Sequence, residues 1–194
     1  MVCRLDGQET VAFGLTLTEL WQLFPIQLVE HDPSWRDWYD DEVVSLKALL
    51  GSTIQRINHI GSTAIEGLLA KPIVDILLQV VDGCEIDGLK DRLAANGWLL
   101  MAERSKPHLQ LDFNKGYTPD GFAERVYHLH IRYVGDWDEL HFRDYLIAHP
   151  EEAAEYAALK QRLFAQYEHD RDAYTEAKGD FIRDCTAKAR DSAL

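Results

Sequence analysis

Cysteine is scarce in this sequence, and long apolar runs are missing. The chain of 194 residues has 3 cysteines, Cys3, Cys84 and Cys185, which are odd in number and far apart. This spacing fits neither a disulfide framework nor the paired cysteines of a zinc site, so we expect free thiols. The chain has no apolar stretch of about 20 residues that could cross a bilayer, and its first residues lack the apolar core of a secretory signal. We therefore expect a cytoplasmic protein with no membrane partner.

Positive charge is also in short supply. Lys and Arg number 20 against 33 Asp and Glu, which gives a formal net charge of -13. Such a surface repels a long polyanion, so general binding to nucleic acid is not expected. A nucleotide or another small phosphorylated ligand is still compatible with this charge, because it needs only a local group of basic side chains and backbone amides. The sequence leaves the oligomeric state open.

The apolar pattern indicates one α/β domain. A capping-box pattern predicts a helix over residues 16–21, so we expect an N-terminal helical extension over residues 1–25 and the domain proper over residues 26–190. Helical spacing is clear over residues 32–51 and 86–96. The expected strands are short apolar or alternating runs bounded by turn residues: 26–29, 53–60, 72–81, 108–114 and 126–134.

From Trp137 onward the apolar spacing is helical, with breaks at Pro150 and around Asp170. The apolar stripes of these helices are too wide to remain exposed. We therefore expect them to pack on the sheet and not to form a separate domain.

Gly61, Ser62 and Thr63 follow an expected strand and are a candidate phosphate-binding turn. Glycine lets the backbone approach a ligand closely, and the turn can offer bare amides and two hydroxyls. Such tripeptides are also common in ordinary turns, so the segment alone is a weak signal.

Asp75 stands inside the apolar strand 72–81, where a carboxylate is costly unless a cation pairs with it. That cation could be a metal ion, or a structural partner such as Lys71 or an arginine. The pattern alone does not separate the two cases.

The stretch from His59 to Leu77 resembles the signature of the GrpB family. Motifs that match the same family follow one another along the chain: EHDPSW at 30–35, YHLH at 127–130, HFRDYL at 141–146, HP at 149–150 and YTEAK at 174–178. The resemblance implies a nucleotidyltransferase-like fold, with a mixed sheet of about five strands flanked by helices. It also implies Mg²⁺ or Mn²⁺ as cofactor and a link to nucleotide metabolism, since family members occur fused to dephospho-coenzyme A kinase.

In the nucleotidyltransferase superfamily, two acidic residues one position apart hold the metal. Gly61-Ser62 and Asp75 match that pattern, but Leu77 stands where a second acidic residue is expected. His128 and His130 are the best substitutes, because residues two apart on a strand project from one face and neutral imidazole binds metals. The alternative is a pair of histidines on a solvated strand face.

Lys71, Arg143 and Lys178 are candidate contacts for a phosphate group. Their alternative role is a salt bridge to one of the many carboxylates, which Asp144 makes easy for Arg143. Two functions follow from these residues. The first is a nucleotidyltransferase that moves a nucleotidyl or phosphoryl group to a small acceptor, with Asp75 as the catalytic carboxylate. The second, which Leu77 favours, is a nucleotide-binding or partner-binding module without catalysis.

Overall fold

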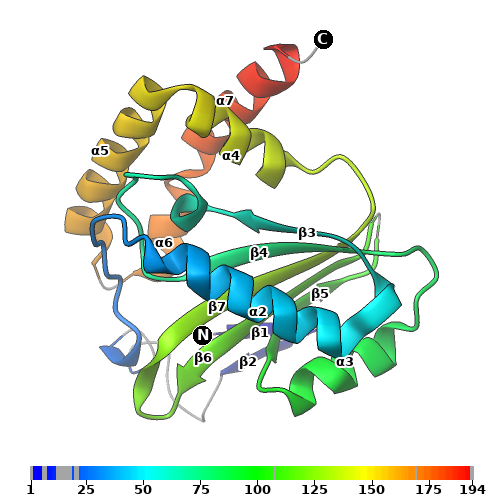
Figure 1. Cartoon of the computed structure of the whole chain (residues 1–194). Helices are drawn as coiled ribbons and strands as arrows, with labels where there is room; N and C mark the ends of the chain where they lie inside the picture. The colour runs from blue at the N-terminus through cyan, green and yellow to red at the C-terminus, as the bar shows by residue number, and fades with distance from the viewer. Residues whose placement is uncertain are drawn as a thin grey trace.

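The chain forms one seven-stranded mixed sheet with helices on one face and beyond one edge (Figure 1). A computed structural model describes residues 2–5, 8–11, 19, 22–106, 108–168 and 170–192. The strand order is β2-β1-β5-β6-β7-β4-β3. The strands are β1 (Val2–Leu5), β2 (Gln8–Val11), β3 (Ile54–Ile60), β4 (Val74–Val80), β5 (Leu99–Arg104), β6 (Gln110–Thr118) and β7 (Gly121–Tyr133).

One face of the sheet is apolar and is covered by α2 (Ser34–Leu50) and α3 (Ile86–Ala95), which lie in front of the strands in Figure 1. Asp32 Oδ1 accepts a hydrogen bond from the backbone N–H of Ser34 at 2.9 Å, as expected for the start of α2. The largest core cluster joins the two helices to alternate residues of the central strands. Its strand residues include Val74, Ile76, Leu78, Val80, Leu111, Phe113, Tyr127, Leu129 and Ile131.

The other face of the same strands is polar at its centre. Because side chains alternate along a strand, the residues between the core positions point away from α2 and α3. On β4, β6 and β7 these residues are Asp75, Leu77, Gln79, Asp112, Asn114, His128, His130 and Arg132. The period of two in the sequence therefore separates a packing face from a face that carries ionisable groups.

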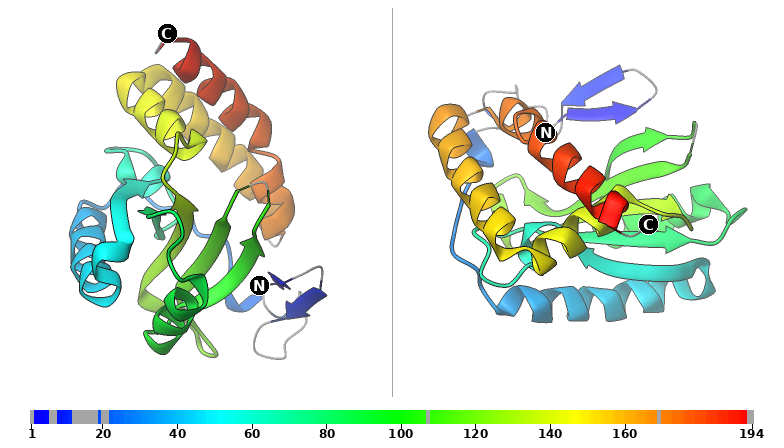
Figure 2. Two further views of the ribbon diagram at one scale, coloured as in Figure 1. Left: turned by 90° about the vertical axis from the view of Figure 1, so that its right-hand side faces the viewer. Right: turned by 90° about the horizontal axis from the view of Figure 1, so that it is seen from above.

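Four helices follow the sheet: α4 (Asp138–Ala148), α5 (Pro150–Tyr167), α6 (Arg171–Glu176) and α7 (Gly179–Ser192). The two views of Figure 2 place them together along one side of the sheet. Ile65 and Leu68, in the loop between β3 and β4, pack into a core cluster with residues of α4, α5 and α7. Ile26 packs with Leu163 and Tyr174 in a second cluster. The helices thus pack against the β3–β4 loop and the segment around Ile26, and the expectation that they form no separate domain stays a prediction.

The mixed sheet with flanking helices agrees with the expected fold class, but the strands differ in detail. Residues 26–29 form only an isolated bridge between Val29 and Ala70, whereas β5 was not expected from the sequence. The count of five holds for the sheet from β5 to β3, and a hairpin of β1 and β2 adds two more strands through a parallel pairing with β5.

The N-terminal segment corrects another expectation. Within residues 1–25, a helical extension was expected, yet residues 2–5 and 8–11 are strands of the sheet. The helix over residues 16–21 lies almost entirely outside the described residues, with Glu19 alone among them. The domain boundary at residue 26 stays a prediction. Every helix in the described part of the chain is too short or too polar to cross a lipid bilayer.

Candidate metal and phosphate site

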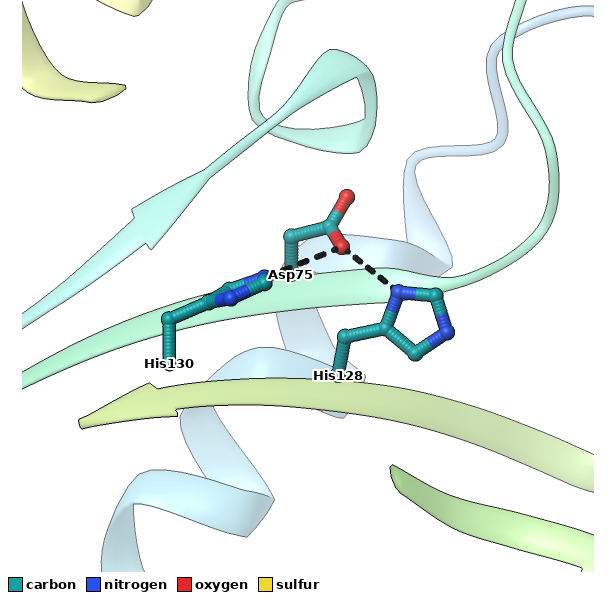
Figure 3. Close-up of side chains that lie close together, drawn as sticks. All are labelled: Asp75, His128 and His130. Carbon is teal, nitrogen blue, oxygen red and sulfur yellow. Dashed lines mark hydrogen bonds and ion pairs between the residues drawn. The ribbon is translucent and has the colours of Figure 1, made fainter. Parts of the chain in front are cut away.

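The pairing of β4 with β7 brings Asp75, His128 and His130 together. The two strands run parallel, with Asp75 opposite His128 and Leu77 opposite His130. His128 Nδ1 lies 3.0 Å from Asp75 Oδ1, and His130 Nε2 lies 3.8 Å from the same oxygen. Figure 3 shows both imidazoles turned toward this carboxylate. One ligand atom from each residue lies within 4.8 Å of the others, and this is the only such group of three in the described part of the chain.

Each imidazole has a second partner on its far side. His130 Nδ1 is 2.9 Å from Asp112 Oδ1, and His128 Nε2 is 2.9 Å from the hydroxyl of Tyr117. Arg132 Nη2 donates to the same Asp112 oxygen at 2.9 Å. The orientations of both rings are therefore fixed from the outside, by residues of β6 and β7.

Burial and pairing act in opposite directions on the charges of this group. Burial raises the pKa of Asp75, but hydrogen bonds from His128 and His130 outweigh it and hold the pKa well below 3.8. Burial lowers the pKa of His130, whereas hydrogen bonds to Asp112 and Asp75 raise it to about 9. The pKa of His128 falls below 6.5 because burial dominates there. Asp75 is thus held ionised.

The turn after β3 touches this carboxylate directly. Gly61 has φ 69° and ψ -172°, a left-handed conformation that favours glycine. A Cβ at Gly61 would lie 2.3 Å from Asp75 Oδ2. Glycine is therefore needed here both for the backbone angle and for the close approach of Asp75.

Three lysines surround the space beyond this turn. Lys160 on α5, 3% exposed, donates to Ser62 Oγ at 3.0 Å and also to the carbonyl oxygen of Leu69. Lys178 and Lys71 lie over the ring of Tyr174, with Nζ 4.5 and 5.6 Å from its centroid.

The lysines are desolvated. Burial, and then the positive charge of Lys178, lower the pKa of Lys160 to about 7. Burial likewise lowers the pKa of Lys178 to about 8, against the opposing effect of Asp75. Burial and the neighbouring charges of Lys178 and Arg171 place the pKa of Lys71 well below 10.5. A cluster of this kind favours an anion that would restore the lost solvation.

Asp75, the two histidines, the glycine turn and the three lysines line one cavity of about 730 Å³. Its lining includes Gly61, Ser62, Lys71, Asp75, His128, His130, Lys160, Tyr174 and Lys178. The hydroxyl of Tyr174, a buried residue of this lining, has no hydrogen-bond partner among the described residues. The candidate metal ligands and the basic side chains thus line the same cavity.

Two of the expected phosphate contacts are used elsewhere. The hydroxyl of Thr63 donates to the carbonyl oxygen of Ile73 at 3.3 Å and lies 3.0 Å from His59 Nε2. Arg143 donates to the carbonyl oxygen of His59 at 2.8 Å and forms an ion pair with Asp144. His59 and Arg143 line a different cavity, on the α2 side of β3. The structure thus places Arg143 in a different cavity from Asp75, with β3 between them, and its assignment as a phosphate contact stays a prediction.

The family model for "GrpB protein" matches residues 25–188. The chain belongs to the GrpB family. The protein YqkA of Bacillus subtilis is 33% identical over 190 residues, which cover 94% of this chain and 53% of YqkA. The glutamate-rich protein GrpB of Alkalihalophilus pseudofirmus is 33% identical, over 80% of this chain and 90% of that protein. This GrpB chain thus spans about half the length of YqkA and nearly all of the shorter relative.

A solved structure supports the same assignment. The crystal structure of the conserved protein GrpB from Enterococcus faecalis superposes with a TM-score of 0.73 at 28% sequence identity. The match covers 86% of this chain and 99% of that one. The resemblance read from the sequence motifs is therefore confirmed at the level of family and fold.

The donor set of this GrpB chain fits a divalent cation. One carboxylate and two imidazoles converge within 4.8 Å, and each imidazole is oriented by a further partner. Asp75 does not hydrogen-bond Lys71 or an arginine in the described part of the chain; its partners are the two histidines. Their side chains are 21% and 27% exposed, so the alternative of two solvated histidines is also wrong.

Sequence reasoning missed three residues of this site: Lys160, Asp112 and Tyr117. Lys160 lies in a helix that reads as ordinary amphipathic sequence, and its contact with Ser62 spans 98 positions. Asp112 alternates with Leu111 and Phe113 on β6, so a strand period carried forward from His108 could have placed it on the polar face.

Proposed function

We propose that this GrpB chain binds the phosphate groups of a nucleotide in the Asp75 cavity and transfers a nucleotidyl or phosphoryl group to a small acceptor. The observation that carries the proposal is the meeting of two kinds of group in one cavity. Asp75, His128 and His130 supply metal-type ligands, and a glycine turn with three lysines supplies a site for an anion.

The lysines define the charge of the ligand. Lys71, Lys160 and Lys178 face the cavity with Asp75 as the nearby ionised carboxylate, and this carboxylate is already paired with the histidines. A ligand with more than one negative charge, such as a diphosphate or triphosphate group, would balance the three ammonium groups. Ser62 accepts a hydrogen bond from Lys160 and so fixes the position of its ammonium group at the turn.

A divalent cation held by Asp75, His128 and His130 would stabilise negative charge on a phosphate oxygen. The protein's own groups would do the rest. Lys178 and Lys160 would orient the phosphates beside the turn that begins at Gly61. The remainder of the cavity, about 730 Å³ in all, leaves room for more than a phosphate group.

Leu77 favours the second function, a binding module without catalysis. In the two-carboxylate pattern this position would supply another ligand, and Leu77 is fully buried instead. The register of β4 and β7 supports the first function against it, because His130 lies directly opposite Leu77 and provides a ligand from the adjacent strand. Both functions share the nucleotide site.

Calorimetric titration with a panel of nucleoside triphosphates, with and without a divalent cation, tests the shared part. We expect metal-dependent binding to the unaltered chain and its loss in Asp75→Asn. Asp144→Asn is the matched control, because Asp144 lines a different cavity and its side chain is 61% exposed. Equal binding by Asp75→Asn and the unaltered chain would overturn the proposed site.

Release of pyrophosphate, which accompanies nucleotidyl transfer, or of the nucleoside diphosphate, which accompanies phosphoryl transfer, separates catalysis from binding. We expect release from the bound triphosphate in the presence of small alcohol, amine or phosphate acceptors, and none from Asp75→Asn. Nucleotide binding without release across the acceptor panel would assign the chain to the second function.

A further inference from the structure

The three candidate metal ligands of the site differ in their donor atoms. Two are imidazole nitrogens, of His128 and His130, and one is the carboxylate of Asp75. Mg²⁺ prefers oxygen ligands and gives up its water reluctantly, whereas imidazole suits Zn²⁺, Fe²⁺, Ni²⁺ and Cu²⁺. The identity of the metal can therefore be inferred from the ligand atoms.

We infer that this site selects an imidazole-binding transition metal of the Zn²⁺ type, not the Mg²⁺ that the superfamily implies, and that Asp112 is its positioning residue. The inference deepens the proposed function and rests on it only for the presence of a metal. It concerns which ion the residues accept, and ion binding can be measured without any nucleotide.

Asp112, which could supply a second oxygen ligand, already has two partners of its own. Asp112 is a further carboxylate on the polar face, beside His130, and its Oδ1 lies 2.9 Å from both His130 Nδ1 and Arg132 Nη2. Leu77 supplies no oxygen. The site thus offers one carboxylate, and conversion to an oxygen-rich Mg²⁺ site would require Asp112 to leave two partners, one of them an arginine that is 5% exposed.

Both histidines are presented in the way that metal-binding imidazoles require. His130 turns Nε2 toward Asp75 while its Nδ1 contacts Asp112, and His128 turns Nδ1 toward Asp75 while its Nε2 contacts Tyr117. A metal ion would replace the protons through which the inward nitrogens bond Asp75, and a proton kept on each outward nitrogen would then leave a lone pair on each inward one. A carboxylate behind a metal-binding histidine fixes the tautomer and increases the basicity of the ligand nitrogen. Asp112 would orient His130 in this way without itself binding the ion.

Titration of chelator-treated protein with Zn²⁺, Mn²⁺ and Mg²⁺ tests the inference. We expect one Zn²⁺ per chain, bound on the order of 100-fold more tightly than Mn²⁺, and no competition by millimolar Mg²⁺. Co²⁺ bound in place of Zn²⁺ should give visible absorption bands that report nitrogen ligands. Mg²⁺ binding at least as tight as Zn²⁺ would overturn the inference while leaving the proposed nucleotide site intact.

Three variants locate the ion. His130→Gln should lose Zn²⁺ binding, by about 100-fold or more, because a ligand is removed. Asp112→Asn should weaken Zn²⁺ by about 10-fold to 100-fold and shift the Co²⁺ bands, since the hydrogen bond to His130 remains but its charge is gone. His141→Gln is the control, because His141 also pairs with an aspartate, Asp136, outside the group of three.

Denaturant unfolding of the same variants measures their stability and so separates a structural role from a role in metal binding. If Asp112→Asn lowers stability but leaves Zn²⁺ affinity and the Co²⁺ spectrum unchanged, Asp112 is structural and its assigned role is wrong. Zn²⁺ affinity unchanged in His130→Gln would reject the metal site itself.

Discussion

Alternate residues of β4 and β7 point to opposite faces of the sheet and have different roles on the two faces. Toward α2 and α3, Ile76, Leu78, Leu129 and Ile131 are completely buried and form the main core. Away from those helices, the residues between them include Asp75 and two histidines, which burial alone would disfavour. Neighbouring positions of one strand thus belong to different faces. One face stabilises the fold, and the other carries ionisable side chains.

The contrast shows how the protein keeps buried ionisable groups without losing its structure. The apolar face supplies stability through burial that does not depend on ligands. The polar face depends on mutual pairing of its side chains and, in our proposal, on a metal ion and an anion. Substitutions on the two faces should therefore have separable effects.

The largest effect on stability is expected from Leu78→Ala on the apolar face. Leu78 is 0% exposed within the main core, so we expect a loss of about 2–5 kcal/mol in the free energy of unfolding. Zn²⁺ affinity of the folded variant should be nearly unchanged. Denaturant unfolding and metal titration check both parts, with Val44→Ala, at a position 69% exposed, as a control that should change little.

Gly61→Ala should lower both the stability of the fold and the affinity for Zn²⁺. The left-handed backbone at φ 69° costs about 1–3 kcal/mol for a residue with a side chain, and the new Cβ would meet Asp75 Oδ2. We expect reduced stability together with weaker Zn²⁺ binding, because the carboxylate must move. Gly67→Ala has a similar angle, φ 73°, and nothing within 4 Å of its Cβ position. It should cost stability alone, and weakened metal binding in this control would contradict the steric explanation.

Lys160→Met isolates the anion site on the polar face. The change removes a desolvated charge but leaves the carbonyl oxygen of Leu69 without its donor, so we expect stability to change by less than about 1 kcal/mol as the two effects oppose each other. Binding of inorganic pyrophosphate should weaken by about 10-fold, the loss of one charge-assisted hydrogen bond. Calorimetry measures it, and Lys188→Met, at an exposed position of α7, is the control. Pyrophosphate binding unaffected by Lys160→Met would remove this lysine from the site.

The buried lysines should also make the stability of the chain depend on pH. Lys160 and Lys178 have pKa values of about 7 and 8 in the folded chain, below the usual 10.5. Between these values and 10.5 the unfolded chain binds more protons, so the contribution of both lysines to stability rises with pH in that window. At lower pH the folded chain carries the full cost of burying their charges. Unfolding of ligand-free protein from pH 7 to 10 should show a flatter rise in Lys160→Met, and equal slopes would contradict the assigned pKa.

Binding of an anion should show the opposite pH dependence. Pyrophosphate prefers the protonated lysines, so its affinity should fall as the pH rises above about 7 to 8. Calorimetry in buffers of different ionisation enthalpy should also detect proton uptake on binding near pH 8. Affinity that stays constant from pH 7 to 9 would argue against contacts through these two lysines.

The sequence was sufficient for the parts of this molecule that depend on local pattern. The period of two over residues 126–134 predicted β7 and placed His128 and His130 on one face, and Asp32-Pro33 predicted the start of α2. Asp75 was identified because a carboxylate is out of place in an apolar strand. These signals need only neighbouring residues.

The remainder depends on contacts between distant segments. The partner of Asp75 could not be chosen between a lysine, an arginine and a metal, because the β4–β7 register decides it. Arg143 and Lys178 were both candidate phosphate contacts, and the sequence did not show that they line different cavities. β5 was missed because Leu99 to Arg104 does not alternate clearly, and its pairing with β6 decides the conformation.

The parallel pairing of β4 with β7 also has a consequence for the order of folding. Asp75 and His128 are separated by 53 positions, and the intervening chain contains α3, β5 and β6. Closing so large a loop is slow compared with forming local hairpins such as β6–β7. A refolding chain should therefore acquire its ability to bind Zn²⁺ later than its hairpins, and the time at which Zn²⁺ binds would report when β4 and β7 pair.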